Sequence, residues 1–169
     1  IDKIAGEPLV NIGHARASES SLNVKRLCDI VFGTLGLVIS APIILVLGLA
    51  IRRDSPGPAI FSQERIGKNK KPFTIYKLRS MRANAEINGP ELSAPDDSRV
   101  TRIGHFIRKY RIDELPQFWN VVRGDMSLVG PRPERAYYVE KIMERAPYYT
   151  LLQQVRPGLT SLGMVKYGY

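Results

Sequence analysis

The sequence predicts a mostly helical α+β protein attached to a membrane, and three features carry that prediction. The first is an apolar run of 25 residues, 27–51. The second is a pair of segments with roughly alternating apolar and polar residues on either side of KNKK, residues 68–71, which is typical of a β-hairpin. The third is a helical periodicity that resumes at residue 99. We therefore expect a re-entrant helix-break-helix membrane hairpin, a small β-hairpin and interfacial amphipathic helices.

The composition narrows the class of protein. The 169 residues suffice for one domain with a sizeable core, and 25 Lys and Arg against 16 Asp and Glu give a net charge of +9. This excess favours an anionic partner, either nucleic acid, phospholipid headgroups or a phosphorylated substrate. No zinc-finger, RNA-recognition or helix-turn-helix signature is present, and such a module would leave the apolar run unexplained. We therefore expect no nucleic-acid partner.

Cysteine and histidine usage is uninformative about catalysis. Cys28 is the single cysteine of this chain, so it cannot form an internal disulfide, and a reducing environment is expected. His14 and His105 are isolated, and no Cys/His cluster suggests a zinc site.

The apolar run is long enough to cross a membrane, because about 20 helical residues span about 30 Å of hydrocarbon. Its flanks favour another topology. Basic pairs at 25–26 and 52–53 stand at both ends, whereas a single span usually carries its positive charge at the cytoplasmic end. Pro42 removes a backbone donor near the centre, and so bends or breaks the helix.

Ser40 can bond a carbonyl that the proline frees, at Gly36, so that no polar group is left unsatisfied in hydrocarbon. We expect Ser40 and Pro42 to mark the break of a re-entrant hairpin whose two ends lie on one face of the membrane. A proline-kinked ordinary span and a helix buried in a soluble core are the alternatives.

The remaining elements follow in order. DSPGP, residues 54–58, predicts a rigid turn, and the hairpin arms are expected at 59–67 and 72–80. Residues 84–98 have the composition of a loop. From residue 99 we expect a basic amphipathic helix that either lies in the headgroup plane or packs on a core. Its expected apolar face consists of Val100, Ile103, Phe106, Ile107 and Tyr110. A further helix is expected over 133–152.

Candidate chemistry is concentrated in residues 108–134. Asp113 and Glu114 are adjacent at the expected start of a helix. One carboxylate can attack phosphorus while its neighbour holds a divalent cation, which suits phosphoryl chemistry because the attacked group is itself anionic. Acids at a helix N-terminus are also favoured by capping and by the helix dipole, so a purely structural role stays open.

Arg132 lies in Gly130-Pro131-Arg132-Pro133, where prolines on both sides fix its backbone in an extended form. Arginine binds phosphate oxygens bidentately, so a phosphate contact is one interpretation, and a salt bridge to Glu134 is the other. Further candidate phosphate contacts, each of which taken singly would more often be a solvated surface charge, are Lys77, Arg79, Arg108 and Arg156.

Five blocks in a fixed order resemble the bacterial sugar transferase family, the monotopic polyprenol-phosphate phosphoglycosyltransferases. The blocks are KRLCDIVFG, SAP, DSPGPAIFSQERIGKNKKPFTIYKLRSM, RIGHFIRKYRIDELPQFWNVVRGDMSLVGPRPE and VRPGLT. They run from Lys25 to Thr160, and their combination is specific where each alone is not.

The resemblance implies a reaction. A UDP-sugar donates its sugar phosphate to undecaprenyl phosphate on the cytoplasmic face of the bacterial inner membrane, UMP is released, and Mg²⁺ is required. Asp113 matches the nucleophile that forms an aspartyl phosphosugar intermediate, and Glu114 matches the Mg²⁺-binding partner, so both are expected metal ligands. Arg132 and Arg108 match arginines that contact phosphate or the active site, and Lys77 matches a further contact.

The resemblance also divides the chain. Residues 1–22 correspond to a linker from a missing N-terminal portion, 23–53 to the membrane hairpin and 54–169 to a cytosolic catalytic domain. Ser40 and Pro42 match the break, although Ala41 separates a pair that is adjacent in some members. Family members continue beyond the equivalent of the last residue here, which implies a C-terminally truncated catalytic portion of a longer member.

The donor sugar is not readable from these residues. UDP-glucose and UDP-galactose are the expected donors, the product pathway is capsule, exopolysaccharide or O-antigen synthesis, and the linker leaves room for a homodimer. The competing hypothesis is a non-catalytic, membrane-anchored assembly scaffold, which would need the apolar hairpin and the basic helix but neither Asp113 nor Arg132.

Overall fold

The computed structural model describes residues 2–4, 7–9, 18–85 and 97–167. Its helices are α1 (Glu19–Asp54), α2 (Arg102–Lys109), α3 (Gln117–Arg123), α4 (Ala136–Arg145) and α5 (Leu162–Tyr167). Its strands are β1 (Asp2–Ile4), β2 (Glu7–Leu9), β3 (Ile60–Ile66), β4 (Pro72–Leu78), β5 (Ser127–Val129) and β6 (Gly158–Thr160). Three 3₁₀ segments are η1 (Lys68–Lys70), η2 (Ile112–Glu114) and η3 (Pro147–Gln154). The predicted mixture of helices and small sheets is confirmed.

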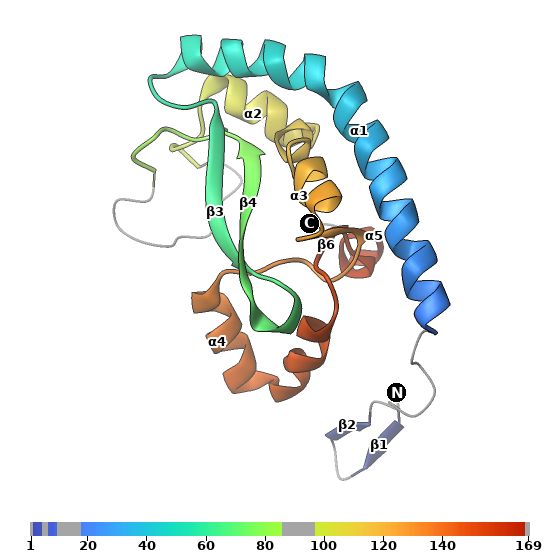
Figure 1. Ribbon diagram of the computed structural model, residues 1–169. Coiled ribbons are helices and arrows are strands. Elements are labelled where there is room, and N and C mark those ends of the chain that lie inside the picture. Colours follow the sequence, from blue (N-terminus) through green and yellow to red (C-terminus); the bar gives the residue numbers. More distant parts are fainter. Residues whose placement is uncertain (1, 5–6, 10–17, 86–96, 168–169) are drawn as a thin grey trace.

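Helix α1 is a single element of 36 residues that arches along one side of the molecule (Figure 1). The hydroxyl of Ser18 caps its N-terminus by accepting a hydrogen bond from the N–H of Ser21 at 3.2 Å. Within the described residues it is the one helix that is long and apolar enough to cross a membrane, by length and composition.

The break expected at Ser40 and Pro42 is absent, since α1 continues through Pro42 and curves instead (Figure 1). A proline ring removes one hydrogen bond and pushes against one carbonyl, which bends a helix when the flanking turns keep their bonds. The Ser40 hydroxyl donates to the carbonyl of Leu37 at 3.2 Å, and not to that of Gly36. The re-entrant path itself is not shown by this geometry.

One stripe of α1 faces the rest of the chain. Buried or half-buried residues recur in steps of three or four, which places them on one side of a helix. The residues with this spacing are Arg26, Asp29, Gly33, Gly36, Ser40, Ile44, Leu47 and Ile51, and Leu37, Gly48 and Ala50 beside them are also half-buried. The exposed apolar residues on the other sides include Leu27, Val31, Phe32, Leu35, Val38, Ile39, Leu45, Val46 and Leu49. Helix α1 therefore docks through a narrow stripe and leaves a broad apolar surface uncovered.

The first half of α1 packs on α3. A Cβ atom added to Gly36 would lie 2.7 Å from the ring of Phe118, so the glycine permits the close approach. The guanidinium of Arg26 donates to the carbonyls of Val121 and Val122, both at 2.8 Å. These carbonyls belong to the last turn of α3, where backbone acceptors lack partners within the helix and favour a cation.

Asp29 joins the same half of α1 to β5. One of its carboxylate oxygens accepts from the hydroxyl of Ser127 and from the N–H of Leu128, each at 3.0 Å. The other oxygen lies 3.3 Å from Nζ of Lys25, one turn earlier. A charge in the apolar run is thus buried with its bonding partners present.

The last turns of α1 enter the core of the same body. Ile51 packs with Leu78 of β4 and Ile107 of α2, and all three are buried. The Asp54 carboxylate accepts from the N–H of Ile103 at 3.3 Å. Both ends of α1 are therefore held by one compact unit.

The predicted β-hairpin is confirmed. Strands β3 and β4 pair antiparallel, from Ile60 opposite Leu78 to Ile66 opposite Pro72. Its turn contains Asn69 and Lys70 at φ of 56° and 61°. A second core cluster, of Ile75, Val121 and Met126, packs the hairpin on α3. Strands β5 and β6 form a separate parallel pair.

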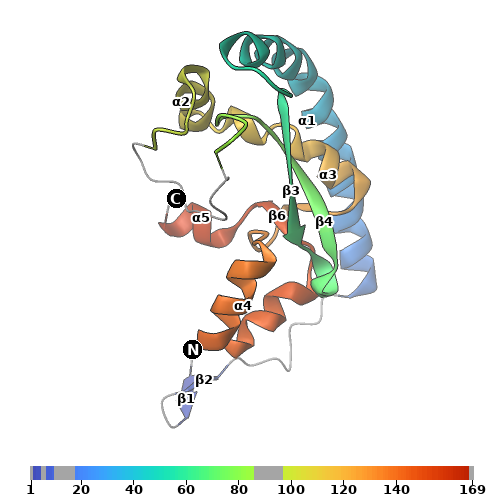
Figure 2. The ribbon, with the colours of Figure 1, turned by 90° about the vertical axis from the view of Figure 1, so that its left-hand side faces the viewer.

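The two later helices differ from expectation in part. Helix α2 occupies the predicted segment from residue 99, and its apolar face is divided: Ile107 is buried, whereas Phe106 and Tyr110 are exposed with their rings 5.1 Å apart. The helix expected over 133–152 is shorter, because Pro147 cannot continue it; α4 ends at Arg145 and η3 follows. Figures 1 and 2 both place α4 and η3 beside the turn end of the hairpin.

Two sequence-based expectations fall largely outside the described residues. In the expected linker, 1–22, strands β1 and β2 pair antiparallel and α1 begins at Glu19. Of the expected loop 84–98, residues 86–96 are not described.

We expect Asp29→Ala to lower the free energy of unfolding by about 2–4 kcal/mol, because two donors of β5 and the neighbouring ammonium lose their acceptor. Cys28→Ala is the matched control, since Cys28 is exposed on the adjacent position of α1, and it should change the value by less than about 0.5 kcal/mol. Thermal unfolding of the detergent-solubilised protein measures both, and equal transition temperatures would contradict the role of Asp29 in docking α1.

Candidate functional site

Asp113 and Glu114 lie in η2, a single 3₁₀ turn between α2 and α3. The chain enters this turn through Arg111, whose φ of 57° is left-handed. The helix that was expected to start at the acids begins later, at Gln117. Because a 3₁₀ helix has three residues per turn, neighbouring side chains project about 120° apart. The two carboxylates are both buried, at 9% and 7% exposure, and meet different surroundings.

The loop that carries Arg132 is held in place by the RPG segment. The N–H of Gly158 donates to the carbonyl of Pro131 at 2.8 Å, and the N–H of Gly130 donates to that of Thr160 at 3.0 Å. A Cβ atom on Gly130 would lie 2.4 Å from the carbonyl oxygen of Arg156, so only glycine permits this approach. The distant block VRPGLT therefore supports the position of Arg132.

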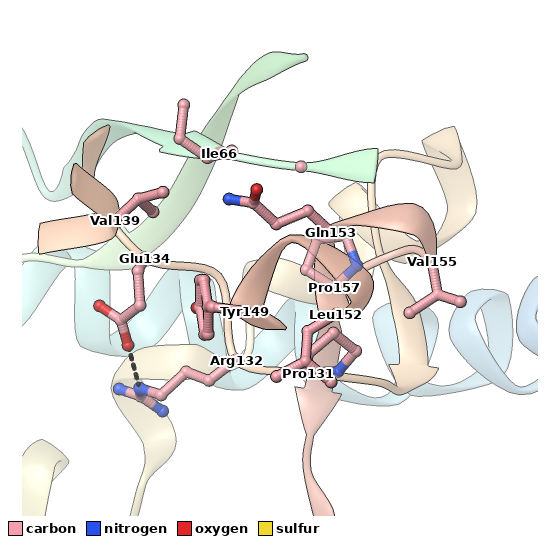
Figure 3. Close-up of a pocket in the computed structure, with 11 residues that line it drawn as sticks. Ile66, Pro131, Arg132, Glu134, Val139, Tyr149, Leu152, Gln153, Val155 and Pro157 are labelled. Atoms are coloured by element: carbon pink, nitrogen blue, oxygen red, sulfur yellow. Dashed lines mark ion pairs between the residues drawn. The ribbon is translucent and has the colours of Figure 1, made fainter. Parts of the chain in front are cut away.

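Arg132 stands between two carboxylates. Its Nε lies 4.0 Å from Oε1 of Glu134, and its Nη2 lies 3.9 Å from Oε1 of Glu114. Figure 3 shows the Glu134 contact at the edge of a pocket of about 20 Å³, whose lining includes Tyr149 and Gln153. That pocket has room for about one water molecule and not for a substrate. Arg132 therefore lies near Glu134, the salt-bridge partner considered in the sequence analysis, and also near Glu114 of the acid pair.

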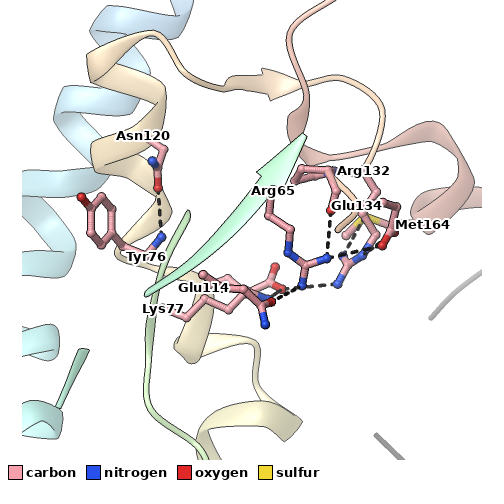
Figure 4. A network of polar contacts seen from close by, with 10 residues as sticks. Arg65, Tyr76, Lys77, Glu114, Asn120, Arg132, Glu134 and Met164 are labelled. Atoms are coloured by element: carbon pink, nitrogen blue, oxygen red, sulfur yellow. Dashed lines mark hydrogen bonds and ion pairs between the residues drawn. The ribbon is translucent and has the colours of Figure 1, made fainter. Parts of the chain in front are cut away.

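Glu114 is the paired carboxylate. Its Oε1 lies 2.8 Å from Nζ of Lys77, which reaches it from β4 (Figure 4). Burial would raise the pKa of Glu114, but the charges of Lys77 and Arg132 outweigh burial and hold that pKa below its ordinary value of 4.5. Glu114 therefore stays ionised over a wide pH range.

Asp113 is the carboxylate with bonding capacity to spare. Its Oδ1 is buried and accepts no hydrogen bond from the residues that the structure describes, and Nη1 of Arg108 is likewise buried without an acceptor among them. Burial raises the pKa of Asp113 above 3.8, and Glu114 adds to the rise, while Lys77 and Arg108 oppose it. Neighbouring acids with opposite pKa shifts are suited to different tasks.

Asp113 opens on a cavity of about 410 Å³ between the hairpin, the segment after β4, α2 and the start of α4. This volume is that of a small-molecule site. Among the described residues, seven cationic and two acidic side chains line it, a formal balance of +5. The cations are Arg65, Lys77, Arg79, Arg82, Arg108, Arg132 and Arg135, and the acids are Asp113 and Glu134. Such a wall favours a ligand with several negative charges.

Two of the predicted phosphate contacts are engaged elsewhere. The guanidinium of Arg79 donates to the carbonyls of Pro56 and Ser55, both at 2.6 Å, and so fixes the turn that follows α1. The Nε of Arg156 donates to the carbonyl of Gly124 at 3.1 Å, and Arg156 does not line the cavity. The number of lysine and arginine residues in a motif does not show which of them bind backbone carbonyls and which contact a ligand. The structure does bring Lys77, Arg108 and Arg132 together with Asp113 at the cavity, and Lys77 and Arg132 also lie near Glu114.

The sequence interpretation missed Arg65, Arg82 and Arg135. For Arg65 a signal was present: side chains alternate along a strand, so Arg65 and Phe61 share one face of β3, and Phe61 pairs with Lys77. For the other two, which lie in or beside loops, no periodicity was available.

The acid pair fits magnesium only with help from a substrate. Among the described residues no group of three or more His, Cys, Asp or Glu side chains could hold a metal ion. Magnesium prefers oxygen ligands and usually takes one or two carboxylates with phosphate oxygens and waters. The unpaired Oδ1 of Asp113 provides such a ligand, next to Glu114. The carboxylates of Asp113 and Glu114, together with phosphate oxygens of a bound ligand, would provide the oxygen ligands of Mg²⁺.

Comparisons with known proteins agree with the resemblance in the sequence. Residues 20–169 match the family model described as "Bacterial sugar transferase". A Bacillus subtilis protein, provisionally named an undecaprenyl-phosphate N-acetylgalactosaminyl 1-phosphate transferase, is 53% identical over 129 residues, which are 76% of this chain and 72% of that protein.

Two longer relatives match over most of this chain. The UDP-N-acetylgalactosamine-undecaprenyl-phosphate N-acetylgalactosaminephosphotransferase of Aeromonas hydrophila is 44% identical over 86% of the chain. The UDP-glucose:undecaprenyl-phosphate glucose-1-phosphate transferase of Escherichia coli is 36% identical over 98% of it. The matched regions cover 34% and 36% of these two proteins, so the chain spans about a third of their length.

We expect opposite effects on stability when each acid is neutralised. The raised pKa of Asp113 means that its contribution to stability is present below about pH 3.8 and is lost as the pH rises through its folded pKa; Asp113→Asn should therefore leave the unfolding free energy at pH 7 unchanged or raise it. Glu114 stabilises above about pH 4.5 and ceases to do so as the pH falls through its folded pKa. Glu114→Gln should accordingly cost about 1–3 kcal/mol at pH 7.

Thermal unfolding of both variants, at about pH 7 and about pH 4, measures the effect. The cost of Glu114→Gln should shrink at the lower pH. A larger loss for Asp113→Asn than for Glu114→Gln at pH 7 would contradict the assignment of the two environments.

Proposed function

Because the chain belongs to the bacterial sugar transferase family, we propose that it transfers a sugar 1-phosphate from a UDP-sugar to undecaprenyl phosphate and releases UMP, an early membrane step of polysaccharide or glycoconjugate synthesis. One observation carries the chemistry: Asp113 has an unpaired, buried carboxylate oxygen at the wall of a cavity lined by seven cations. A diphosphate donor supplies the negative charge that such a wall favours.

Asp113 is the nucleophile in this proposal. Its Oδ1 attacks the β-phosphorus of the donor, the bond between that phosphorus and the bridging oxygen breaks, and the electron pair leaves with UMP. The product is an aspartyl phosphosugar. Lys77, Arg108 and Arg132 lie around the acids and bind the phosphate oxygens on which charge is concentrated.

The second step uses the same carboxylate as the leaving group. An oxygen of the undecaprenyl phosphate attacks the phosphorus of the intermediate, and the phosphorus–Asp113 bond breaks to give the diphosphate-linked lipid and a free carboxylate. The water-soluble donor and the lipid acceptor therefore never need to occupy the cavity together, which suits a single cavity of about 410 Å³.

Glu114 has a supporting role. It is held ionised by Lys77 at 2.8 Å, so it fixes the ammonium next to Asp113. Asp113 and Glu114 are the residues that would hold Mg²⁺, which when bound offsets the negative charge of the diphosphate.

The same geometry supports a re-entrant membrane segment in 23–53. Arg26 and Asp29 bind α3 and β5, and Ile51 lies in a core of the same unit. A helix that crossed the bilayer would carry its ends to opposite faces, about 30 Å apart. Because both ends dock on one unit, we propose that α1 inserts its exposed apolar side into one leaflet and that residues 54–169 lie on the cytoplasmic face.

The donor sugar is proposed at the level of its class. Relatives are named for N-acetylgalactosamine, glucose and galactose phosphate transfer. The donors to test on this chain are therefore UDP-N-acetylgalactosamine, UDP-glucose and UDP-galactose.

The reaction predicts UMP release when the detergent-solubilised chain is incubated with undecaprenyl phosphate, Mg²⁺ and one of these donors. Asp113→Asn should lower the rate at least about 10³-fold, because an amide cannot form the covalent intermediate. Glu144→Gln, a neutralised acid on the exposed side of α4, is the control and should stay within about twofold. Removal of divalent cations with EDTA should also stop turnover.

Two outcomes would overturn parts of this proposal. Full activity of Asp113→Asn would remove the nucleophile assignment. Absence of UMP release with every UDP-sugar in a broad panel would favour the assembly-scaffold hypothesis.

The re-entrant path predicts that both flanks of α1 are labelled from the same side. In a Cys28→Ala background, Asn23→Cys and Arg53→Cys place single thiols at exposed positions near each end. A membrane-impermeant maleimide should modify both in inverted inner-membrane vesicles and neither in intact spheroplasts. Modification of the two thiols from opposite sides would contradict the proposed path.

A further inference from the structure

Asn120 is a fully buried polar residue in the middle of α3, at 0% exposure, and the reaction as proposed makes no use of it. Its side-chain oxygen accepts from the N–H of Tyr76 at 3.2 Å, and its Nδ2 donates to the carbonyl of Thr74 at 2.7 Å. Figure 4 shows the first of these bonds beside Lys77 and Glu114. Both bonded groups belong to β4.

The two hydrogen bonds of Asn120 take the place of bonds that a neighbouring strand would make with β4. Backbone groups of alternate residues in a strand point to the same edge, so the N–H of Tyr76 and the carbonyl of Thr74 lie on the edge of β4 that does not face β3. An unpaired donor and acceptor there, buried from water, would be costly. The primary amide of Asn120 presents its oxygen and one of its two N–H groups to β4 in a fixed geometry, and so takes the place of one peptide group of an adjacent strand.

The link joins the two segments that carry the acid pair and its cation. Lys77 follows Tyr76 directly in β4, and Glu114 precedes Asn120 by six residues, across η2 and the first turn of α3. The Lys77–Glu114 contact at 2.8 Å thus depends on how far β4 lies from η2 and α3, and on the register between them. The two hydrogen bonds of the Asn120 side chain constrain both quantities.

We propose that Asn120 is a positioning residue: its bidentate contact with the edge of β4 holds Lys77 against Glu114, beside Asp113. The catalytic meaning of this inference rests on the proposed function, whereas its structural content, the coupling between Asn120 and the Lys77–Glu114 pair, does not.

Few side chains can substitute for Asn120. Alanine leaves both β4 groups without a partner, and serine can satisfy one of them at most. Aspartate has the same shape but no donor, so it would set a carboxylate oxygen against the carbonyl of Thr74 and near Asp125, whose carboxylate lies 3.4 Å from Nδ2.

Val121 provides the matched control. It is the next residue of α3, it is also at 0% exposure, and its side chain packs in the cluster with Ile75 and Met126 and makes no hydrogen bond. Val121→Ala therefore loosens the packing of α3 on the hairpin and leaves the edge contact of β4 in place. Both alanine variants are expected to lower the transition temperature, so loss of stability alone does not distinguish them.

The first experiment is a double-mutant cycle in thermal unfolding, which needs no enzyme activity. Glu114→Gln is introduced into the wild-type, Asn120→Ala and Val121→Ala chains, in detergent. We expect the drop in transition temperature caused by Glu114→Gln to be at least halved in the Asn120→Ala background and to keep its full size in the Val121→Ala background. The same drop in all three backgrounds would overturn the inference. If Asn120→Ala does not fold, Asn120→Ser takes its place with the same expectations.

The second experiment is kinetic. Lys77→Met should lower kcat/KM for the UDP-sugar at least tenfold in the wild-type and Val121→Ala chains, and less than about twofold in the Asn120→Ala chain, because Lys77 is already displaced there. Asn120→Ala alone should lower kcat/KM at least tenfold per folded molecule, and Val121→Ala less than about threefold. Multiplicative effects of Lys77→Met and Asn120→Ala would overturn the positioning role.

The two experiments separate the failure of this inference from failure of the proposed function. If the wild-type chain releases no UMP from any donor, the function fails, and the unfolding cycle still decides whether Asn120 holds the Lys77–Glu114 pair. If the wild-type chain is active and the cycle is additive, the function stands and Asn120 is only part of the core.

Discussion

The docking of both ends of α1 on one compact unit is the constraint on which the rest of the structure depends. At one end of α1, Arg26 donates hydrogen bonds to carbonyls in the last turn of α3, and Asp29 accepts hydrogen bonds from β5. At the other end, Ile51 packs in the core with residues of β4 and α2. These contacts lie more than twenty residues apart along the helix, so the helix can only arch over the unit. Its broad apolar side then faces outward along the whole arch, so the apolar helix and the cationic cavity belong to the same compact unit.

The two adjacent acids of the site differ because the nearby cations are divided unequally between them. Lys77 and Arg132 are directed at Glu114, and their attraction exceeds the effect of burial there. Asp113 is as deeply buried, but no donor in the described part of the chain bonds its Oδ1, so burial prevails. Two residues of nearly identical chemistry thereby acquire opposite pKa shifts, and Asp113 keeps a buried oxygen for a ligand. The 3₁₀ turn makes this possible, since it directs adjacent side chains to different neighbours.

Much of the fold and part of the site could be predicted from the sequence. The length and composition of the apolar run, the alternation around KNKK and the periodicity after residue 99 depend on nearby residues, and each corresponds to an observed element. Predictions failed where distant packing intervened: the helix does not break at Pro42, because its flanking turns remain bonded and docked. The phosphate contacts predicted for Arg79 and Arg156 stay predictions: both side chains donate to backbone carbonyls from other parts of the chain, and Arg79 also lines the cavity. Residue type alone does not tell a contact with backbone carbonyls from a ligand contact.

By itself, the sequence determined that an apolar helix precedes a basic segment and that this segment contains an acid pair and a proline-flanked arginine. It also determined that the ordered blocks are those of the bacterial sugar transferase family. Only the tertiary structure decided which cations meet which acid, which stripe of the helix is covered, and that an asparagine completes the edge of a strand. The physical reason is that these features are contacts across long sequence separations, such as Lys77 with Glu114 and Asn120 with Thr74. A contact of that kind depends on distances and directions that are set only when the elements pack.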